Sequence, residues 1–254
     1  MPTPSTARMH DFEVVSNQEI ADGIFSLVIS APKLASALKP GQFVNIAVPG
    51  DASSLLRVPL SFYRADAEVG TVELWYAVVG DDTRRLSQMG PGGRGWFVPE
   101  GTRKALLVAG GIGVPPVLCL AGMLAEQGVD VDVCLGFGTA SKAVGVDEFR
   151  ALGATVNVCT DDGSLGTHGF CTDPAAELLG EGGYDYVASC GPAVMMKKVA
   201  EAAAEAGAYC EVSLERMMSC GFGACNTCNV ETVDGMKGAC MCGPVFDASK
   251  VVVF

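Results

Sequence analysis

The chain has 254 residues, of which 49% are hydrophobic, and it carries a formal net charge of −12. This charge argues against nucleic acid and anionic membrane as partners, and no uncharged apolar run reaches the roughly 18 residues that span a bilayer. The length suits two domains, or two domains and a small appendage. Eleven cysteines without a secretory signal at the N-terminus predict a protein of the reducing cytoplasm, where thiols stay free to bind metal.

The N-terminal part has the pattern of an all-β domain. Short runs rich in β-branched and aromatic residues are separated by glycine, proline, aspartate and serine, which is the spacing of a sandwich or barrel. Turn signals such as Pro40-Gly41 and Gly90-Pro91-Gly92-Gly93 lie between the runs. We therefore predict an antiparallel barrel over residues 1–101, with strands in 12–20, 23–30, 41–49, 55–63 and 71–79.

A different pattern follows, in which continuous apolar runs alternate with helical segments. The run 105–110 is wholly apolar, as in a parallel strand that is buried on both faces. Alternating strand and helix is typical of a doubly wound parallel sheet, so residues 102–209 are predicted to form an α/β domain. The predicted strands are 105–110, 131–137, 155–160 and 184–189, and the predicted helices are 117–127 and 193–207.

The C-terminal segment, residues 210–254, contains the densest group of cysteines. Cys220, Cys225 and Cys228 have the spacing C-x4-C-x2-C, and Cys240 follows after eleven further residues. This is the plant-type spacing of a [2Fe–2S] cluster, in which three thiolates come from one tight loop and the fourth from a later segment. Glycines between the first two cysteines would let backbone N–H groups approach the sulfurs.

Disulfides, a structural zinc site and inert buried thiols are the alternatives to a cluster at these cysteines. Disulfides need an oxidising compartment. A structural zinc site usually has two C-x2-C pairs or histidines, whereas only Cys225 and Cys228 form such a pair here, and His10 and His168 lie far away in the sequence. Inert buried thiols are common singly but not at this density. Cys242, two residues after the last of the four, is a second candidate for the fourth ligand.

Three segments that follow predicted parallel strands are candidates for nucleotide binding. Gly110-Gly111-Ile112-Gly113 lies between a strand and a helix, where glycines let a pyrophosphate approach the backbone, although the same residues also suit a tight turn. Asp161 and Asp162 follow the third strand and would either bond ribose hydroxyls or cap a turn. Cys190 and Gly191 follow the fourth strand, and Cys190 alone fits a small buried hydrophobe equally well.

The predicted barrel contains a candidate flavin strand. Arg57 and Ser61 place a cation and a hydroxyl on one strand, with Pro59 and Leu60 between them. A flavin has a pyrophosphate and a polar ring edge that need such partners. Taken by itself, this strand is interpreted more simply as one that carries an arginine on a solvated face.

Together these features resemble the ferredoxin-reductase superfamily, and most closely the electron-transfer subunits of NAD-linked dihydroorotate dehydrogenases. The likeness covers nearly the whole chain in the order barrel, nucleotide-binding sheet and cysteine-rich tail. Its most specific parts are the segments 210–218, 220–228 and 240–246, and the segments 40–43, 110–113, 160–164 and 190–192 also match.

The resemblance implies a cofactor for each part of the chain. The barrel would bind FAD, the parallel sheet would bind NAD(H), and a small iron–sulfur domain over 210–254 would hold a [2Fe–2S] cluster on Cys220, Cys225, Cys228 and Cys240. Two positions near the flavin depart from the family's pattern, because Val58 stands in place of its arginine and Asp82 in place of a glycine. The implied flavin ligands are Arg57, Pro59, Leu60, Ser61, Thr83 and the Gly90–Gly95 loop, and the implied nucleotide ligands are Gly110, Gly111, Gly113, Asp161, Asp162, Cys190 and Gly191.

The implied function is the conversion of two-electron transfer into one-electron transfer. NADH delivers two electrons as a hydride, a cluster accepts one at a time, and a flavin between them handles both. No side chain is expected to act as a general base. The chain would be an incomplete enzyme, joined to an FMN-containing catalytic dihydroorotate dehydrogenase subunit in a heterotetramer of pyrimidine biosynthesis. The alternatives are a related flavin and iron–sulfur reductase that serves ferredoxin or another acceptor, and a non-enzymatic zinc-binding scaffold.

Overall fold

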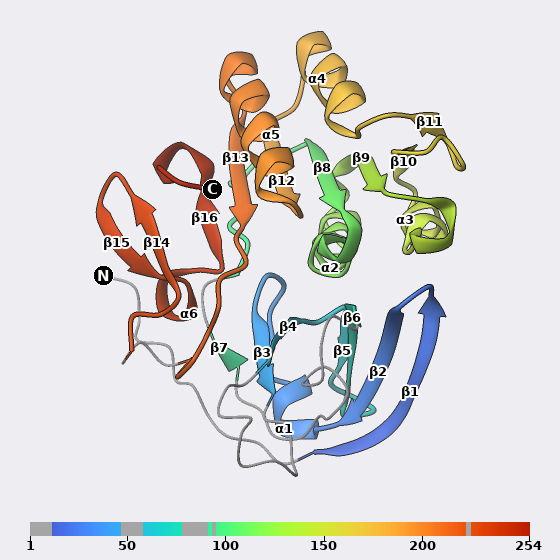
Figure 1. Cartoon of the computed structure of the whole chain (residues 1–254), viewed down its shortest axis with the longest axis vertical. Coiled ribbons are helices and arrows are strands. Elements are labelled where there is room, and N and C mark those ends of the chain that lie inside the picture. The colour runs from blue at the N-terminus through green and yellow to red at the C-terminus, as the bar shows by residue number, and fades with distance from the viewer. Residues whose placement is uncertain (1–11, 47–57, 78–90, 93–94, 222–224) are drawn as a thin grey trace.

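The protein consists of an antiparallel β part, a parallel α/β sheet above it, and a small C-terminal β-hairpin at one side (Figure 1). The computed structural model describes residues 12–46, 58–77, 91–92, 95–221 and 225–254. Among these residues, no helix is long and apolar enough to cross a membrane. The predicted fold class is confirmed by this architecture.

The N-terminal part is built from two antiparallel sheets that enclose one apolar core. The sheets have the strand orders β1-β2-β6-β5 and β4-β3-β7. Alternate residues of each strand point inward, so that Leu27, Ile29, Val44, Ile46 and Leu74 are all fully buried in the core. The elements are β1 (Glu13–Ala21), β2 (Ile24–Ser30), α1 (Pro32–Ala35), β3 (Phe43–Ile46), β4 (Val58–Ser61), β5 (Arg64–Asp66), β6 (Thr71–Ala77) and β7 (Pro91–Gly92).

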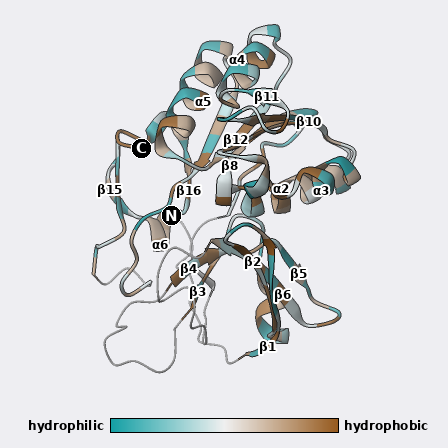
Figure 2. Cartoon of the chain, turned by 45° about the vertical axis from the view of Figure 1, so that its right-hand side comes forward, coloured by the Kyte–Doolittle hydropathy of each residue, from teal (hydrophilic) through white to brown (hydrophobic). Residues whose placement is uncertain are grey.

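The α/β part is a seven-stranded sheet with the order β11-β10-β9-β8-β12-β13-β16, parallel except for β16. Along the central strand β8, Leu107 packs with α2 on one face of the sheet, and Leu106 packs with α4 and α5 on the other. The helices α4 and α5 combine hydrophilic and hydrophobic faces (Figure 2). The elements are β8 (Lys104–Gly110), α2 (Val114–Glu126), β9 (Asp130–Phe137), α3 (Val146–Ala151), β10 (Thr155–Thr160), β11 (Thr167–His168), α4 (Thr172–Glu181), β12 (Tyr186–Cys190) and α5 (Ala193–Ala206).

The C-terminal segment begins and ends in this same sheet. Strand β13 pairs parallel with β12, and β16 returns antiparallel to β13, so the cysteine-rich stretch is an excursion between two paired strands. The cis peptide bond between Gly243 and Pro244 lies just before the returning strand. The elements are β13 (Tyr209–Ser213), β14 (Asn229–Thr232), β15 (Gly235–Gly238), α6 (Ala239–Cys242), β16 (Val245–Asp247) and the short turn η4 (Ala248–Lys250).

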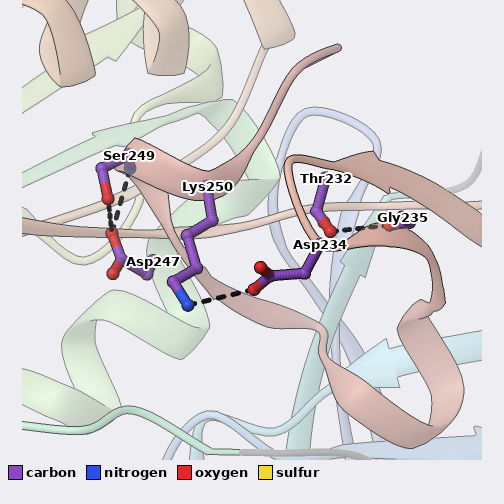
Figure 3. Close-up of polar contacts among 6 residues, drawn as sticks. All are labelled: Thr232, Asp234, Gly235, Asp247, Ser249 and Lys250. Carbon is purple, nitrogen blue, oxygen red and sulfur yellow. Dashed lines mark hydrogen bonds and ion pairs between the residues drawn. The ribbon is translucent and has the colours of Figure 1, made fainter.

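Side-chain contacts tie the hairpin β14–β15 to the end of the chain (Figure 3). Lys250 Nζ lies 3.0 Å from Asp234 Oδ2 at the hairpin turn, and the Thr232 hydroxyl donates to the Gly235 carbonyl at 2.6 Å. The Asp247 carboxylate accepts hydrogen bonds from the backbone N–H and hydroxyl of Ser249. Of these contacts, the Lys250–Asp234 ion pair joins η4 to the hairpin, and the Val233 backbone N–H adds a bond to the Lys250 carbonyl.

Candidate functional site

A cavity of about 390 Å³ lies where the barrel, the parallel sheet and the segment after β13 meet. Three predicted flavin residues of β4, namely Pro59, Leu60 and Ser61, line it, whereas Arg57 and Thr83 lie outside the described residues. Its other walls are mostly apolar or aromatic, as suits a flat ring system with one polar edge. They comprise Phe43, Val58, Trp75, Tyr76, Ala77, Ile112, Pro116, Cys190, Ser213, Leu214, Glu215, Arg216, Met217, Met218 and Pro244.

Pairing within the barrel positions the aromatic walls of this cavity. Phe43 of β3 pairs with Ser61 of β4, which brings both to the same end of their sheet. Trp75 packs against Tyr63 with ring centroids 4.4 Å apart, and its indole N–H donates to Glu73 at 2.9 Å. The barrel therefore holds a rigid aromatic surface next to the β4 strand.

A second cavity, of about 330 Å³, lies at the carboxyl ends of the parallel strands. In open α/β sheets this edge is where nucleotides bind. Gly110, Gly111 and Asp161, three of the residues predicted as nucleotide ligands, line the cavity. The remaining walls are Gly136, Phe137, Gly138, Phe170, Cys171, Thr172, Pro192, Val194, Met195 and Lys198.

The two cavities share a wall made of the two loops that follow β8 and β12. Gly111 lines the second cavity and Ile112 the first, while Cys190 lines the first and Pro192 the second. Gly113 packs so closely on the Cys190 carbonyl that a side chain there would overlap it. The two cavities are therefore neighbours on either side of these two loops.

Cys190 packs in this wall and does not serve as a nucleophile. Burial raises the pKa of the Cys190 thiol to about 12, so the group stays protonated at neutral pH. Gly191 has a φ of +152° and lies against Gly110, where a Cβ would come within 2.9 Å of the Gly110 nitrogen. The predicted ligands Gly110, Gly113, Cys190 and Gly191 are therefore brought together as one packed unit.

The two predicted aspartates have different positions. Asp161 lines the second cavity, whereas the Asp162 carboxylate accepts from the Ser164 backbone N–H at 2.9 Å and from its hydroxyl at 2.6 Å. These hydrogen bonds lower the pKa of the exposed Asp162 carboxyl. Asp162 thus caps a turn, and of the two aspartates only Asp161 is among the cavity's lining residues.

Phe170 and Lys198 belong to the second cavity, although neither was predicted from the sequence. Phe170 is 60% exposed, and the Lys198 ammonium lies 5.7 Å from the centre of its ring. An exposed ring beside a cation is suited to stacking a base and attracting a phosphate. Helical periodicity could have indicated Lys198, because it lies one turn after Val194 on α5 and both residues line the cavity.

The four predicted cluster ligands form two pairs: Cys228 lies beside Cys240, and Cys220 lies beside Cys225. The Cys240 backbone N–H donates to the Cys228 sulfur at 3.4 Å, and both side chains are buried. Cys225 is exposed and its sulfur accepts from the Thr227 hydroxyl at 3.1 Å. Hydrogen bonds from Thr227, and then from Cys220, lower the pKa of Cys225 to about 6.

The chemistry of these donors fits an iron–sulfur group. Iron binds thiolates, and the lowered pKa of Cys225 favours its thiolate form. Cys242 is half-buried two residues after Cys240. Within the described residues, no three side chains of cysteine, histidine, aspartate or glutamate gather closely enough to form a metal site on their own.

Known proteins resemble this chain both in its cysteine-rich segment and in its overall fold. Residues 215–252 match the family model of the iron–sulfur cluster binding domain of dihydroorotate dehydrogenase B. The structure determined for the NADH-dependent reduced ferredoxin–NADP oxidoreductase is similar over 99% of this chain and 91% of its own, with a TM-score of 0.84 and 30% identity. An Amycolatopsis cytochrome P450 reductase has the same fold over 79% of this chain and 66% of its own, with a TM-score of 0.65 and 21% identity.

Two curated relatives extend the match over almost the entire chain. Both are dihydroorotate dehydrogenase B (NAD(+)) electron transfer subunits. The Fusobacterium nucleatum protein is 36% identical and covers 97% of this chain and 99% of its own. The Bacillus caldolyticus protein is 40% identical and covers 94% of this chain and 97% of its own. The chain therefore belongs to the family of the electron transfer subunits of dihydroorotate dehydrogenase B.

Proposed function

We propose that this chain passes electrons between NADH and a partner dehydrogenase through FAD and a [2Fe–2S] cluster. One observation carries the proposal: two cavities share a wall, and the segment that lines the first of them runs directly into the cysteines. Residues 213–218 line the first cavity, which also contains Pro59, Leu60 and Ser61, and Cys220 follows two residues later. This arrangement supports three redox sites that act in series.

Each cofactor is assigned to the residues whose chemistry fits it. FAD would be held by the barrel, residues 1–101, through Pro59, Leu60 and Ser61 of β4, together with the residues that follow β13. NAD(H) would be held by residues 102–209, where Gly110 and Gly111 suit a phosphate, Asp161 suits a ribose hydroxyl and Phe170 suits a base. The cluster is held by residues 210–254 through Cys220, Cys225, Cys228 and Cys240.

The side chains of this chain position the cofactors and exclude water. When bound, a flavin supplies the conversion between a two-electron hydride and single electrons. Gly113 and Gly191 let the two loops between the cavities pack closely, which keeps the two binding sites adjacent, as a direct hydride transfer would require. The protonated Cys190 thiol adds apolar packing there, and no general base is needed.

The partner is a catalytic dihydroorotate dehydrogenase subunit that contains FMN, in a heterotetramer. The names of the relatives support a partner, because an electron transfer subunit requires a second subunit on which to act. The purified holoprotein should reduce artificial dyes with NADH and leave orotate untouched. Co-expression with the neighbouring genes, followed by size-exclusion chromatography, should yield a larger complex that oxidises dihydroorotate with NAD. Turnover of orotate or dihydroorotate by the isolated chain would contradict this proposal.

The second candidate is a reductase that serves ferredoxin. The 30% identity to the NADH-dependent reduced ferredoxin–NADP oxidoreductase structure, across 99% of this chain, favours it specifically. The two functions differ in the acceptor and not in the three cofactor sites. Rapid reduction of ferredoxin by the isolated holoprotein and NADH, with no gain from the catalytic subunit, would favour the second candidate.

A further inference from the structure

Strand β3 has two faces that contact different parts of the molecule. Val44 and Ile46 are fully buried in the barrel core. Phe43 points to the opposite face and packs in the same apolar cluster as Cys228 and Cys240. Asn45 shares that face with Phe43, because side chains alternate along a strand. The outer face of β3 thus meets the cysteine-rich segment.

Asn45 is an unusual residue for this position. Its side chain is 6% exposed, and its Oδ1 atom has no hydrogen-bond partner in the part of the chain that the structure describes. Burying a carboxamide oxygen without a donor costs free energy that an apolar residue of the same size would not cost. Ser189 is the other described residue with such an unpartnered buried oxygen, and it lies in β12 of the parallel sheet.

The amide end of Asn45 lies against the loop of the cluster ligands. Gly221, which directly follows Cys220, has a φ of +73°, and a Cβ on it would overlap the Nδ2 atom of Asn45. Within its own sheet, Asn45 of β3 pairs with Pro59 of β4, and Pro59 lines the first cavity. Asn45 is therefore a polar group between the flavin strand and the first cluster ligand.

We propose that Asn45 is a positioning residue whose Nδ2 amide, the donor that lies against Gly221, hydrogen-bonds to the Cys220 end of the cluster loop and raises the reduction potential of the bound cluster. Its Oδ1 atom is an acceptor and takes no part in this bond. This inference rests on the proposed function, since it requires a cluster on Cys220. Hydrogen bonds to cluster sulfurs and their thiolates favour the reduced state, because that state carries one more negative charge. The same contact joins the flavin strand to the cluster loop and so fixes their relative position.

The test is a redox titration of the purified holoprotein, with the reduced cluster measured by EPR. Asn45→Leu keeps the size and removes the polar group, and Asn45→Asp keeps the shape but adds a negative charge. We expect Asn45→Leu to lower the ratio of reduced to oxidised cluster at a fixed potential about tenfold, which is about 59 mV for one electron. Asn45→Asp should lower it further. The matched control, Ser189→Ala, removes the other unpartnered oxygen and should leave the ratio unchanged.

Iron, sulfide and FAD contents of each variant separate the possible outcomes. Unchanged potentials and EPR spectra in both Asn45 variants, with full cluster content, would overturn the inference. Loss of the cluster from both variants with FAD retained would also overturn it, because Asn45 would then be needed to build the loop and not to tune the cluster. A wild-type protein with FAD but no [2Fe–2S] signal would instead refute the proposed function, and the inference with it.

Discussion

Glu211 is a fully buried carboxylate at the junction between the barrel and the parallel sheet, and replacing it should destabilise the fold strongly. It accepts hydrogen bonds from the Phe97 backbone N–H at 2.8 Å, the Tyr186 hydroxyl at 2.9 Å and the Tyr209 hydroxyl at 3.3 Å. Burial and then the charge of Glu211 raise the pKa of Tyr186 well above its ordinary value, so this hydroxyl keeps the proton that it donates. Phe97 lies between β7 of the antiparallel part and β8 of the parallel sheet.

The expected loss of stability follows from these contacts. Glu211→Ala removes the acceptor from buried donors and leaves a cavity. Each buried donor left without a partner costs about 1–3 kcal/mol, so we expect a loss of about 4 kcal/mol. Glu211→Gln keeps one oxygen, which can still accept from Phe97 and Tyr186, and loses the charge. We expect it to cost about 1–2 kcal/mol, since neutral hydrogen bonds are weaker than charged ones.

The assay is urea unfolding of the holoprotein, followed by circular dichroism, with Glu205→Ala as the control. Glu205 is an exposed carboxylate on α5, and its replacement should change the free energy of unfolding by less than about 0.5 kcal/mol. The reasoning would be refuted if Glu211→Ala were as stable as the control, or if Glu211→Gln were the less stable of the two Glu211 variants.

Three further predictions follow from the site. Cys240→Ser should abolish or greatly perturb the cluster and Cys242→Ser should not, as measured by iron analysis and EPR; loss of the cluster only from the Cys242 variant would reverse the assignment. NADH should reduce the flavin faster than NADPH in stopped-flow experiments, because Asp161 in the second cavity repels a 2′-phosphate, and Asp161→Asn should narrow the difference. An advantage of NADPH at equal concentration would contradict this assignment. Gly113→Ala should destabilise the protein by about 1–3 kcal/mol, because its methyl group would overlap the Cys190 carbonyl. Gly122→Ala, a helical control with open space around it, should stabilise the protein by about 0.5–1 kcal/mol.

Much of the architecture could be predicted from the sequence, because hydrophobic periodicity differs between its parts. The apolar run 105–110 corresponds to β8 (Lys104–Gly110), and the segment 155–160 corresponds to β10 (Thr155–Thr160). The helices α3 and α4 were not predicted. Residues 209–213 were not expected to form a strand of the parallel sheet, since its pairing with β12 depends on partners far away in the chain.

The site residues show a similar division between local and distant determinants. The glycine-rich turn at Gly110 and Gly113 could be predicted because it follows a buried strand, whereas the packing of Gly113 on the Cys190 carbonyl joins residues that are distant in the chain. Asp161 and Asp162 could not be distinguished, since only the folded turn places Ser164 against one of them. The buried position of Asn45 against Gly221 joins residues 176 positions apart, and no local pattern indicates such a contact.

The central claim is that electrons pass from NADH to the flavin and from the flavin to the cluster. Anaerobic rapid mixing of the holoprotein with NADH tests it most directly, with flavin reduction followed by absorbance and the cluster by EPR of rapidly frozen samples. We predict that the flavin is reduced first, that the reduced cluster appears afterwards, and that Cys240→Ser retains only the first phase. Reduction of the cluster by NADH in protein from which the flavin has been removed would contradict the claim.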